Sequence, residues 1–275
     1  MKDVIKLMLK GGVIGIANVI PGVSGGTMAV VLGIYQKLIE AIGNFLTQEE
    51  KRKEYAIFLG KVFAGAGAAI VVFSWLMDYL LTHYEQHTYL FFIGLILGSV
   101  PSIYKTHSNM KLSLPAFLTF CVGISLILLI FLFAPVHHAP IKTEMGVSID
   151  ARQAIMLVIS GIFSGGSMIM PGISGSFILV LLGQYHIVIR AVKNINVIPL
   201  FFLGIGVAFG IWSFAKIIDI LLKRFPKETF YFILGLVVAS VVPIFPGIPT
   251  GFGGVLTAIV VFSIAVFLSY KLGDR

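Results

Sequence analysis

Charged residues are scarce in this chain. Asp, Glu, Lys and Arg together make up 12% of its 275 residues, whereas a soluble domain carries about 25%. Hydrophobic residues make up 58%, and the mean hydropathy is +1.01. A water-soluble protein of this size could not cover such a chain with polar surface. The composition therefore excludes an ordinary soluble domain and predicts a protein that is embedded in the lipid bilayer.

Cysteine is nearly absent, since the only one, Cys121, lies in an apolar run. An intramolecular disulfide is excluded, and no metal-ligand spacing occurs, so we expect no metal and no cofactor. Acidic residues number 12 against 20 Lys and Arg, which gives a net charge of +8. In a soluble protein this charge would suggest nucleic acid as a partner. Here the basic residues lie mostly in short loops, which indicates the positive-inside bias of membrane proteins and no nucleic-acid partner.

What the sequence does contain is long apolar runs. They far exceed the ~10 residues of a barrel strand and do not alternate with polar residues, so we predict membrane-spanning helices. An apolar segment with a glycine-rich turn precedes each set of three spans. We interpret each such segment as a helical hairpin, with one helix in, a turn and one helix back; the sequence leaves open whether the hairpins are re-entrant or fully spanning. The predicted hairpins are 11–42 and 153–193, and the predicted spans are 55–81, 88–104, 112–134, 198–222, 229–245 and 252–270.

The two halves of the chain repeat each other. Shifted by 150 positions, residues 21–42 match residues 171–192 at 10 of 22 positions, and both contain Pro-Gly-x-Ser-Gly followed by Leu-Gly-x-Tyr. Shared composition of apolar helices explains single Gly or Leu matches, but not this ordered string. With a shift of 141 the matches continue through the spans: Asp78/Asp219, Leu80/Leu221, Thr88/Thr229, Phe91/Phe232, Gly94/Gly235 and Ser99/Ser240.

These matches predict one all-α integral membrane domain made of two repeats, residues 1–134 and 151–275. A hairpin returns to its own side and three spans follow, so each repeat crosses the membrane an odd number of times and the second is inverted relative to the first. In this topology 13 Lys and Arg residues fall on one side, four on the other and three within helices. The bias predicts a multi-pass protein with both termini in the cytoplasm.

The two turns have the chemistry of an anion site. Proline ends the incoming helix, glycine allows close approach of a ligand, and serine can cap the outgoing helix. Free backbone N–H groups and the positive end of the helix dipole then favour a phosphate, and inverted repeats with broken helices are a transporter design. A plain helix–helix turn with a serine cap, or close helix packing on glycine, is the alternative. The candidate phosphate-binding residues are Pro21, Gly22, Ser24, Gly25, Gly26, Thr27, Pro171, Gly172, Ser174, Gly175 and Ser176.

Polar residues within or beside the predicted membrane segments form a second candidate set. They could contact a headgroup or a coupling ion, either a proton or sodium. The alternatives are snorkelling of lysine to the membrane surface and solvated helix ends. The candidates are Asn18, Glu40, Lys61, Asp78, Arg190, Lys216 and Asp219.

The segments Gly15-Ile-Ala-Asn-Val-Ile-Pro-Gly-Val-Ser-Gly-Gly-Thr27 and Met170-Pro-Gly-Ile-Ser-Gly-Ser176, with Gly33-Ile-Tyr35 after the first, resemble a bacterial family. It is the polyprenyl-phosphate (undecaprenyl-phosphate) transporter family, formerly a domain of unknown function. The resemblance covers essentially the whole chain. It implies a protein of the bacterial cell membrane that returns undecaprenyl phosphate from the outer to the cytoplasmic leaflet for cell-wall polymer synthesis. The second turn has Ser176 and Phe177 where the first has Gly26 and Thr27, so the two turns are not expected to bind phosphate equally.

Two other function classes remain open at this point. A small-anion channel or transporter can also use glycine–serine–proline turns at helix N-termini. An enzyme acting on a lipid pyrophosphate would need an acid, a base or a nucleophile with Arg beside the turn. The turns contain no Glu, Asp, His or Arg, so we expect a transporter rather than an enzyme.

Overall fold

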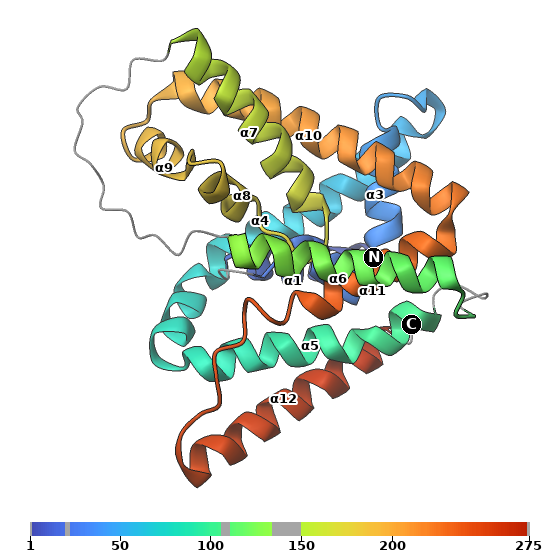
Figure 1. Cartoon of the computed structure of the whole chain (residues 1–275), viewed down its shortest axis with the longest axis vertical. Helices are drawn as coiled ribbons and strands as arrows, with labels where there is room; N and C mark the ends of the chain where they lie inside the picture. The colour runs from blue at the N-terminus through green and yellow to red at the C-terminus, as the bar shows by residue number, and fades with distance from the viewer. Residues whose placement is uncertain (1, 20–22, 106–110, 134–149, 274–275) are drawn as a thin grey trace.

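The computed structural model describes residues 2–19, 23–105, 111–133 and 150–273, and every regular element in them is a helix (Figure 1). The first half contains α1 (Lys2–Val19), α2 (Gly25–Val31), α3 (Tyr35–Asn44), the 3-10 turn η1 (Glu49–Lys51), α4 (Arg52–His83), α5 (Glu85–Lys105) and α6 (Leu114–Phe133). The second contains α7 (Ala151–Ile169), α8 (Gly175–Leu181), α9 (Tyr185–Lys193), α10 (Val197–Arg224), α11 (Pro226–Ala239) and α12 (Gly251–Gly273). Apart from η1, the α-helices occur in the same order in both halves.

The first helix of each half ends just before the proline of its turn. α1 ends at Val19 and α7 at Ile169. Proline has no N–H to donate and also disfavours helical backbone in the residue before it. α7 begins with a cap of its own, because the side chain of Asp150 accepts a hydrogen bond from the Gln153 N–H at 2.7 Å.

The returning arm of each hairpin is broken in two, which the sequence analysis did not predict. α2 is followed by α3 after a break at Gly33, and α8 by α9 after a break at Gly183. Both glycines have a left-handed backbone, with φ of +65° and +68°, which costs other residues energy. The string Leu-Gly-x-Tyr that the two halves share is therefore the signature of this break.

Within each half, the first helix packs along the fourth. α1 lies on α4 and α7 lies on α10. A side chain on Gly11 would overlap the Val62 carbonyl, and one on Gly161 would overlap that of Leu203. Small residues let membrane helices approach this closely.

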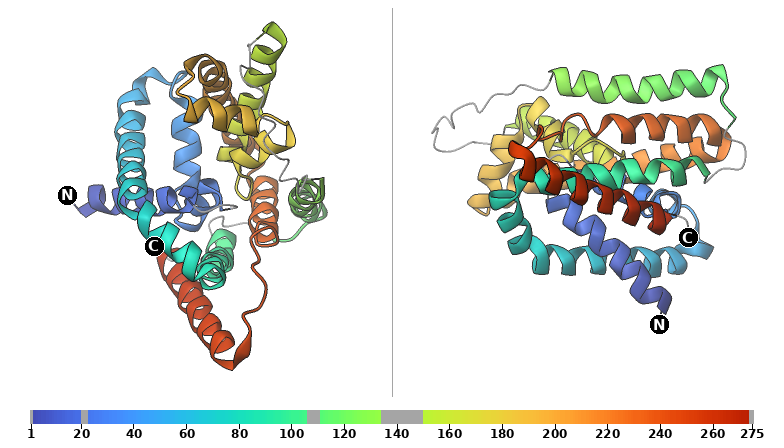
Figure 2. Two further views of the ribbon diagram at one scale, coloured as in Figure 1. Left: turned by 90° about the vertical axis from the view of Figure 1, so that its left-hand side faces the viewer. Right: turned by 90° about the horizontal axis from the view of Figure 1, so that it is seen from below.

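Between the halves, the pairing is exchanged. α5 packs on α12 and α11 packs on α6 (Figure 2). Gly94 lies against the backbone of Phe262, and its counterpart Gly235 lies against Phe120. Each half therefore buries one of its helices against the last helix of the other.

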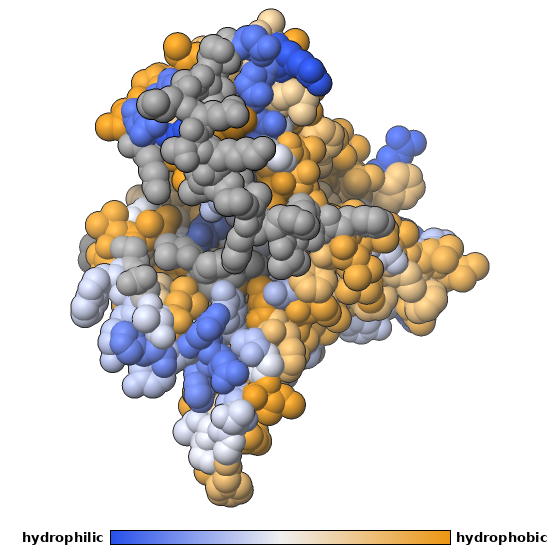
Figure 3. Space-filling view, turned by 60° about the vertical axis from the view of Figure 1, so that its left-hand side comes forward, coloured by the Kyte–Doolittle hydropathy of each residue, from blue (hydrophilic) through white to orange (hydrophobic). Residues whose placement is uncertain are grey.

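The outer surface is that of a protein in lipid. Large apolar side chains such as Val71, Trp75, Phe201 and Phe252 are exposed, and apolar surface covers broad areas in Figure 3. The chain is thus a multi-pass α-helical membrane protein. Among the described residues, five helical segments are long and apolar enough to cross a membrane: Glu49–Phe73, Leu114–Leu132, Ala151–Ile169, Val197–Arg224 and Gly251–Lys271.

The predicted spans 88–104 and 229–245 are not among these five segments. The helix predicted at 229–245 ends at Ala239, because Pro243, Pro246 and Pro249 follow. Its 14 residues extend about 21 Å, less than the ~30 Å of the hydrocarbon core. α7, by contrast, was predicted as a hairpin arm and has the length of a full span.

Candidate functional site

The two Pro-Gly-x-Ser-Gly turns have nearly the same backbone after the proline. Ser24 precedes α2 with φ −97° and ψ 132°, and Ser174 precedes α8 with φ −96° and ψ 135°. Both serines therefore hold the N-cap position that the sequence predicted. Neither side chain caps its helix, so that part of the prediction is wrong. The hydroxyls are directed to other partners.

The two turns lie against each other although about 145 residues separate them. The Thr27 hydroxyl oxygen accepts a hydrogen bond from the Gly172 N–H at 2.7 Å. The Ser24 hydroxyl donates to the Met170 carbonyl oxygen at 3.4 Å. A Cβ on Gly26 would lie 3.0 Å from the Ile169 carbonyl oxygen. The first turn of α2 therefore sits on the last carbonyl groups of α7.

This contact decides how much of the first turn is free for an anion. The positive N-terminus of α2 faces the negative C-terminus of α7, so each helix end partly satisfies the other. Thr27 and Ser24 are buried, at 0% and 5% exposure. The Gly25 N–H is also used, since it donates to Asn18 Oδ1 at 3.2 Å. Pro21 and Gly22 lie outside the described residues.

The second turn is more open. The hydroxyls of Ser174 and Ser176 are 2.8 Å apart, and Ser176 is exposed. The backbone at Gly175 is anchored to α7, because its carbonyl oxygen accepts a hydrogen bond from the Ser164 hydroxyl at 2.9 Å. Two adjacent hydroxyls on an exposed helix start can donate to phosphate oxygens. The sequence difference between the two turns thus corresponds to a difference in accessibility.

Gly172 and Pro171 anchor the second turn in the protein interior. Gly172 has φ +83°, and a Cβ there would lie 2.8 Å from the Leu236 carbonyl oxygen and 2.9 Å from Ser240 Cβ. Pro171 is fully buried. The turn is therefore fixed by both backbone conformation and packing against α11.

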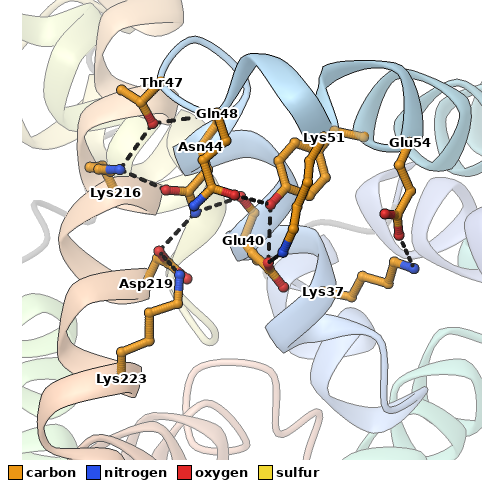
Figure 4. Close-up of polar contacts among 11 residues, drawn as sticks. Lys37, Glu40, Asn44, Thr47, Gln48, Lys51, Glu54, Lys216, Asp219 and Lys223 are labelled. Atoms are coloured by element: carbon orange, nitrogen blue, oxygen red, sulfur yellow. Dashed lines mark hydrogen bonds and ion pairs between the residues drawn. The ribbon is translucent and has the colours of Figure 1, made fainter.

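A second group of polar residues joins α3 to α10, and it contains three of the predicted candidates, Glu40, Lys216 and Asp219 (Figure 4). The residue that connects them is Asn44, which the sequence analysis assigned to a loop. Its side chain donates to Asp219 Oδ2 at 2.8 Å and accepts from Lys216 Nζ at 2.6 Å. Asn44 also donates to the Glu40 backbone carbonyl at 3.0 Å.

Both carboxylates in this group are paired with lysines. Lys223 Nζ lies 2.7 Å from Asp219 Oδ2, and Lys51 Nζ lies 3.6 Å from Glu40 Oε1. The Tyr55 hydroxyl is 3.0 Å from the same Glu40 oxygen. Asp219 is 5% exposed, and a buried carboxylate without partners would be costly. We name Glu40, Asn44, Lys216, Asp219 and Lys223 the α3–α10 cluster.

Of the other predicted candidates, Asn18 contacts the first turn, because its side chain near the end of α1 accepts a hydrogen bond from the Gly25 N–H. Lys61 is half-buried on α4 and Arg190 is half-buried on α9. Position 78 is on α4, but its side chain is outside the described set. Within the described part of the chain, no three His, Cys, Asp or Glu residues are grouped as metal ligands would be.

Known proteins provide an independent comparison. The chain is 34% identical over 253 residues to a polyprenyl-phosphate transporter of Vibrio cholerae, covering 86% of this chain and 76% of that protein. It is 33% identical over 274 residues to a polyprenyl-phosphate transporter of Staphylococcus aureus, covering 97% and 95% respectively. No solved structure matches.

Both turns and most of the helices lie inside a match to a described family. Residues 14–251 match the VCA0040-like family, described as undecaprenyl phosphate translocase-like. This range includes both turns and the α3–α10 cluster. The chain belongs to the VCA0040-like, undecaprenyl phosphate translocase-like family.

Proposed function

We propose that this protein moves a polyprenyl phosphate, specifically undecaprenyl phosphate, from the outer to the cytoplasmic leaflet of the bacterial cell membrane for reuse in cell-wall polymer synthesis. The observation that carries the proposal is the meeting of the two turns inside the protein, through Thr27 and Gly172. The names of the V. cholerae and S. aureus relatives support the substrate class. On this proposal the protein is a transporter and not an enzyme.

The chemical need is a polar route for one charged headgroup. A charge at the centre of the bilayer costs several kcal/mol, about 2.5–3.5 on insertion scales. Hydroxyl and backbone donors at a helix start can replace water around a phosphate. Ser174 and Ser176 are the donors that are open in this structure. We propose that they bind the phosphate while the polyprenyl tail stays in lipid.

The proposed mechanism is alternating access between two inverted repeats, residues 1–134 and 151–275. In this mechanism the first turn, including Ser24 and Thr27, becomes a donor set when it separates from Met170 and Gly172. The residues of both turns then contribute to one two-sided site. A two-sided site requires the motif in both repeats. Alternating access also explains why the hydroxyls of one turn are buried while those of the other are open in the same conformation.

The arrangement of basic residues supports the proposed orientation, with both termini in the cytoplasm. The inverted topology and its charge bias predict that the loops 43–54 and 223–228 face the same side of the membrane. The structure brings their neighbourhoods together, because Asn44 contacts Lys216 and Asp219, and Lys223 contacts Asp219. Two segments that meet in this way must lie at the same membrane depth.

The test is lipid movement by purified protein in liposomes, with a fluorescently tagged short polyprenyl phosphate as the probe. We expect the fraction protected from an external quencher to change faster with protein than without it. Imposed gradients of pH and of sodium would identify the coupling ion. Flux of chloride or inorganic phosphate without movement of the tagged lipid would refute the proposal and favour a small-anion transporter.

A further inference from the structure

The two hairpins are buried very differently. In α2, six of seven residues are buried, whereas in α8 only Gly175 and Leu179 are. The main apolar core of the described residues contains seven residues of α2 and α3, and it contains none of α8 or α9. Two segments with matching sequence thus occupy unlike environments. Sequence composition does not explain this, because both are apolar.

The partner helices differ in the same way. α3 packs along α10, and Gly43 lets it approach closely, since a Cβ there would be 2.9 Å from the Lys216 backbone. By repeat, the corresponding contact is α9 with α4. Among the described residues α9 makes no comparable packing with α4.

The corresponding residues at the two interfaces also differ in their contacts and their exposure. Asn44 corresponds to Asn194 by the 150 shift, and Lys216 corresponds to Trp75 by the 141 shift. Asn44 is 1% exposed and bonded to Lys216. Asn194 is exposed, and Trp75 is 77% exposed. One interface is made, and its counterpart is open.

We propose that these interfaces are two gates that close in turn. The inner gate is Asn44 with Lys216 and Asp219, and it is closed in this structure. The outer gate is Asn194 with Trp75, and it closes in the opposite state, when the inner gate opens. This inference rests on the proposed transport function and its orientation. It assigns the structure to the state in which the headgroup site is reached from the outer leaflet.

The chemistry of the inner gate suits a contact that must open and close. Its hydrogen bonds link groups that water can also satisfy, so these groups keep hydrogen-bond partners when the contact opens. Lys216 and Lys223 both lie at the Asp219 end of the cluster. Their positive charges disfavour a bound cation at Asp219, so the geometry favours a gate over a sodium site.

The inner gate joins residues that are far apart in the sequence. Asn44 and Asp219 are 175 residues apart and belong to different repeats. Lys51, Arg52, Lys223 and Arg224 flank the contact, which places it on the basic side. Closure on that side shuts the cytoplasmic route while the exposed Ser176 leaves the opposite approach open.

Disulfide trapping tests the two gates directly. In a Cys121→Ser background, the pair Asn44→Cys with Lys216→Cys probes the inner gate, and Asn194→Cys with Trp75→Cys probes the outer one. Leu95→Cys with Ser269→Cys is the fixed control, because the Ser269 hydroxyl bonds the Leu95 carbonyl at 2.6 Å. Two exchanged pairs control for random collision: Asn44→Cys with Trp75→Cys, and Asn194→Cys with Lys216→Cys. In each of them several turns of α4 or α10 separate the two cysteines.

We expect both gate pairs to cross-link in membranes at least tenfold faster than the exchanged pairs. Each cross-link should stop movement of the tagged polyprenyl phosphate, and a reductant should restore it. If the outer pair reacts no faster than the exchanged pairs while the fixed control forms, the gate inference is overturned. If both gate pairs form and lipid movement continues unchanged, the contacts are not gates and the gate inference is overturned. If both gate pairs form but no variant, reduced or cross-linked, moves the tagged lipid faster than protein-free liposomes, the proposed transport function is refuted while the two packings stand.

Discussion

The Thr27 side chain and the Gly172 backbone join the two repeats at their turns, through a hydrogen bond of 2.7 Å between Oγ1 and N–H. Thr27 is fully buried and Gly172 has a left-handed backbone. Among the described contacts between the two turns, this is the only hydrogen bond donated by a backbone N–H of the second turn. This single contact makes the strength of the central junction measurable by mutation.

Thr27→Val should weaken this junction without changing the shape of the side chain. The part-buried Gly172 N–H would lose its acceptor, which costs up to about 1–3 kcal/mol. Thr27→Ser keeps the hydroxyl and should cost less. Thermal unfolding in detergent, followed by scanning fluorimetry or circular dichroism, measures the difference. Equal loss in both variants would mean that packing of the methyl group, rather than the hydrogen bond, stabilises the contact.

Gly172→Ala should destabilise the protein more than Gly183→Ala. Both positions have positive φ, so alanine costs about 1–2 kcal/mol at each from backbone conformation. At Gly172 the new Cβ would also collide with Leu236 and Ser240, whereas at Gly183 nothing lies within 4 Å. The difference between the melting temperatures of the two variants gives the destabilisation that is caused by the steric overlap at Gly172. Similar values would contradict the close contact of the second turn with α11.

Local rules predicted part of this structure well. The prolines predicted where α1 and α7 end, and the serines marked the N-caps of α2 and α8. The pairing of Asp219 with Lys223 also follows from i, i+4 spacing on a helix. These features depend on neighbours in the chain, so the sequence carries them directly.

Contacts between distant segments were not predictable in the same way. Asn44 was assigned to a loop because the apolar run ends before it, and only the packing of α3 on α10 makes it the centre of a cluster. The breaks at Gly33 and Gly183 did leave a signal, the repeated Leu-Gly-x-Tyr, but apolar residues on both sides concealed it. The unequal burial of the two similar hairpins depends on which distant helices pack against each of them, and this information is not contained in the hairpin sequences themselves.

Ser174→Ala combined with Ser176→Ala should reduce lipid movement with little effect on stability. The two hydroxyls lie at the surface of the second turn and bond each other, so their loss leaves no buried group unpaired. A hydrogen bond to a charged phosphate contributes about 1.5–3 kcal/mol, which corresponds to a loss of roughly tenfold or more. The liposome assay with tagged polyprenyl phosphate measures it, with the exposed Ser263→Ala on α12 as control. Unchanged transport in the double variant would remove these serines from the site.

A double-mutant cycle on Asn44 and Asp219 should reveal whether the inner gate acts as a unit. Asn44→Ala leaves Lys216 and Asp219 each without one partner, so we expect a loss of about 1–3 kcal/mol in unfolding free energy. Asp219→Asn should cost a similar amount, and the double variant should cost less than the sum of the two, with a coupling of about 0.5–3 kcal/mol. Asn194→Ala is the matched control, because it is exposed and its change should stay within about 0.5 kcal/mol. Chemical denaturation in detergent gives all four values, and strict additivity would show that Asn44 and Asp219 do not stabilise the closed inner gate together.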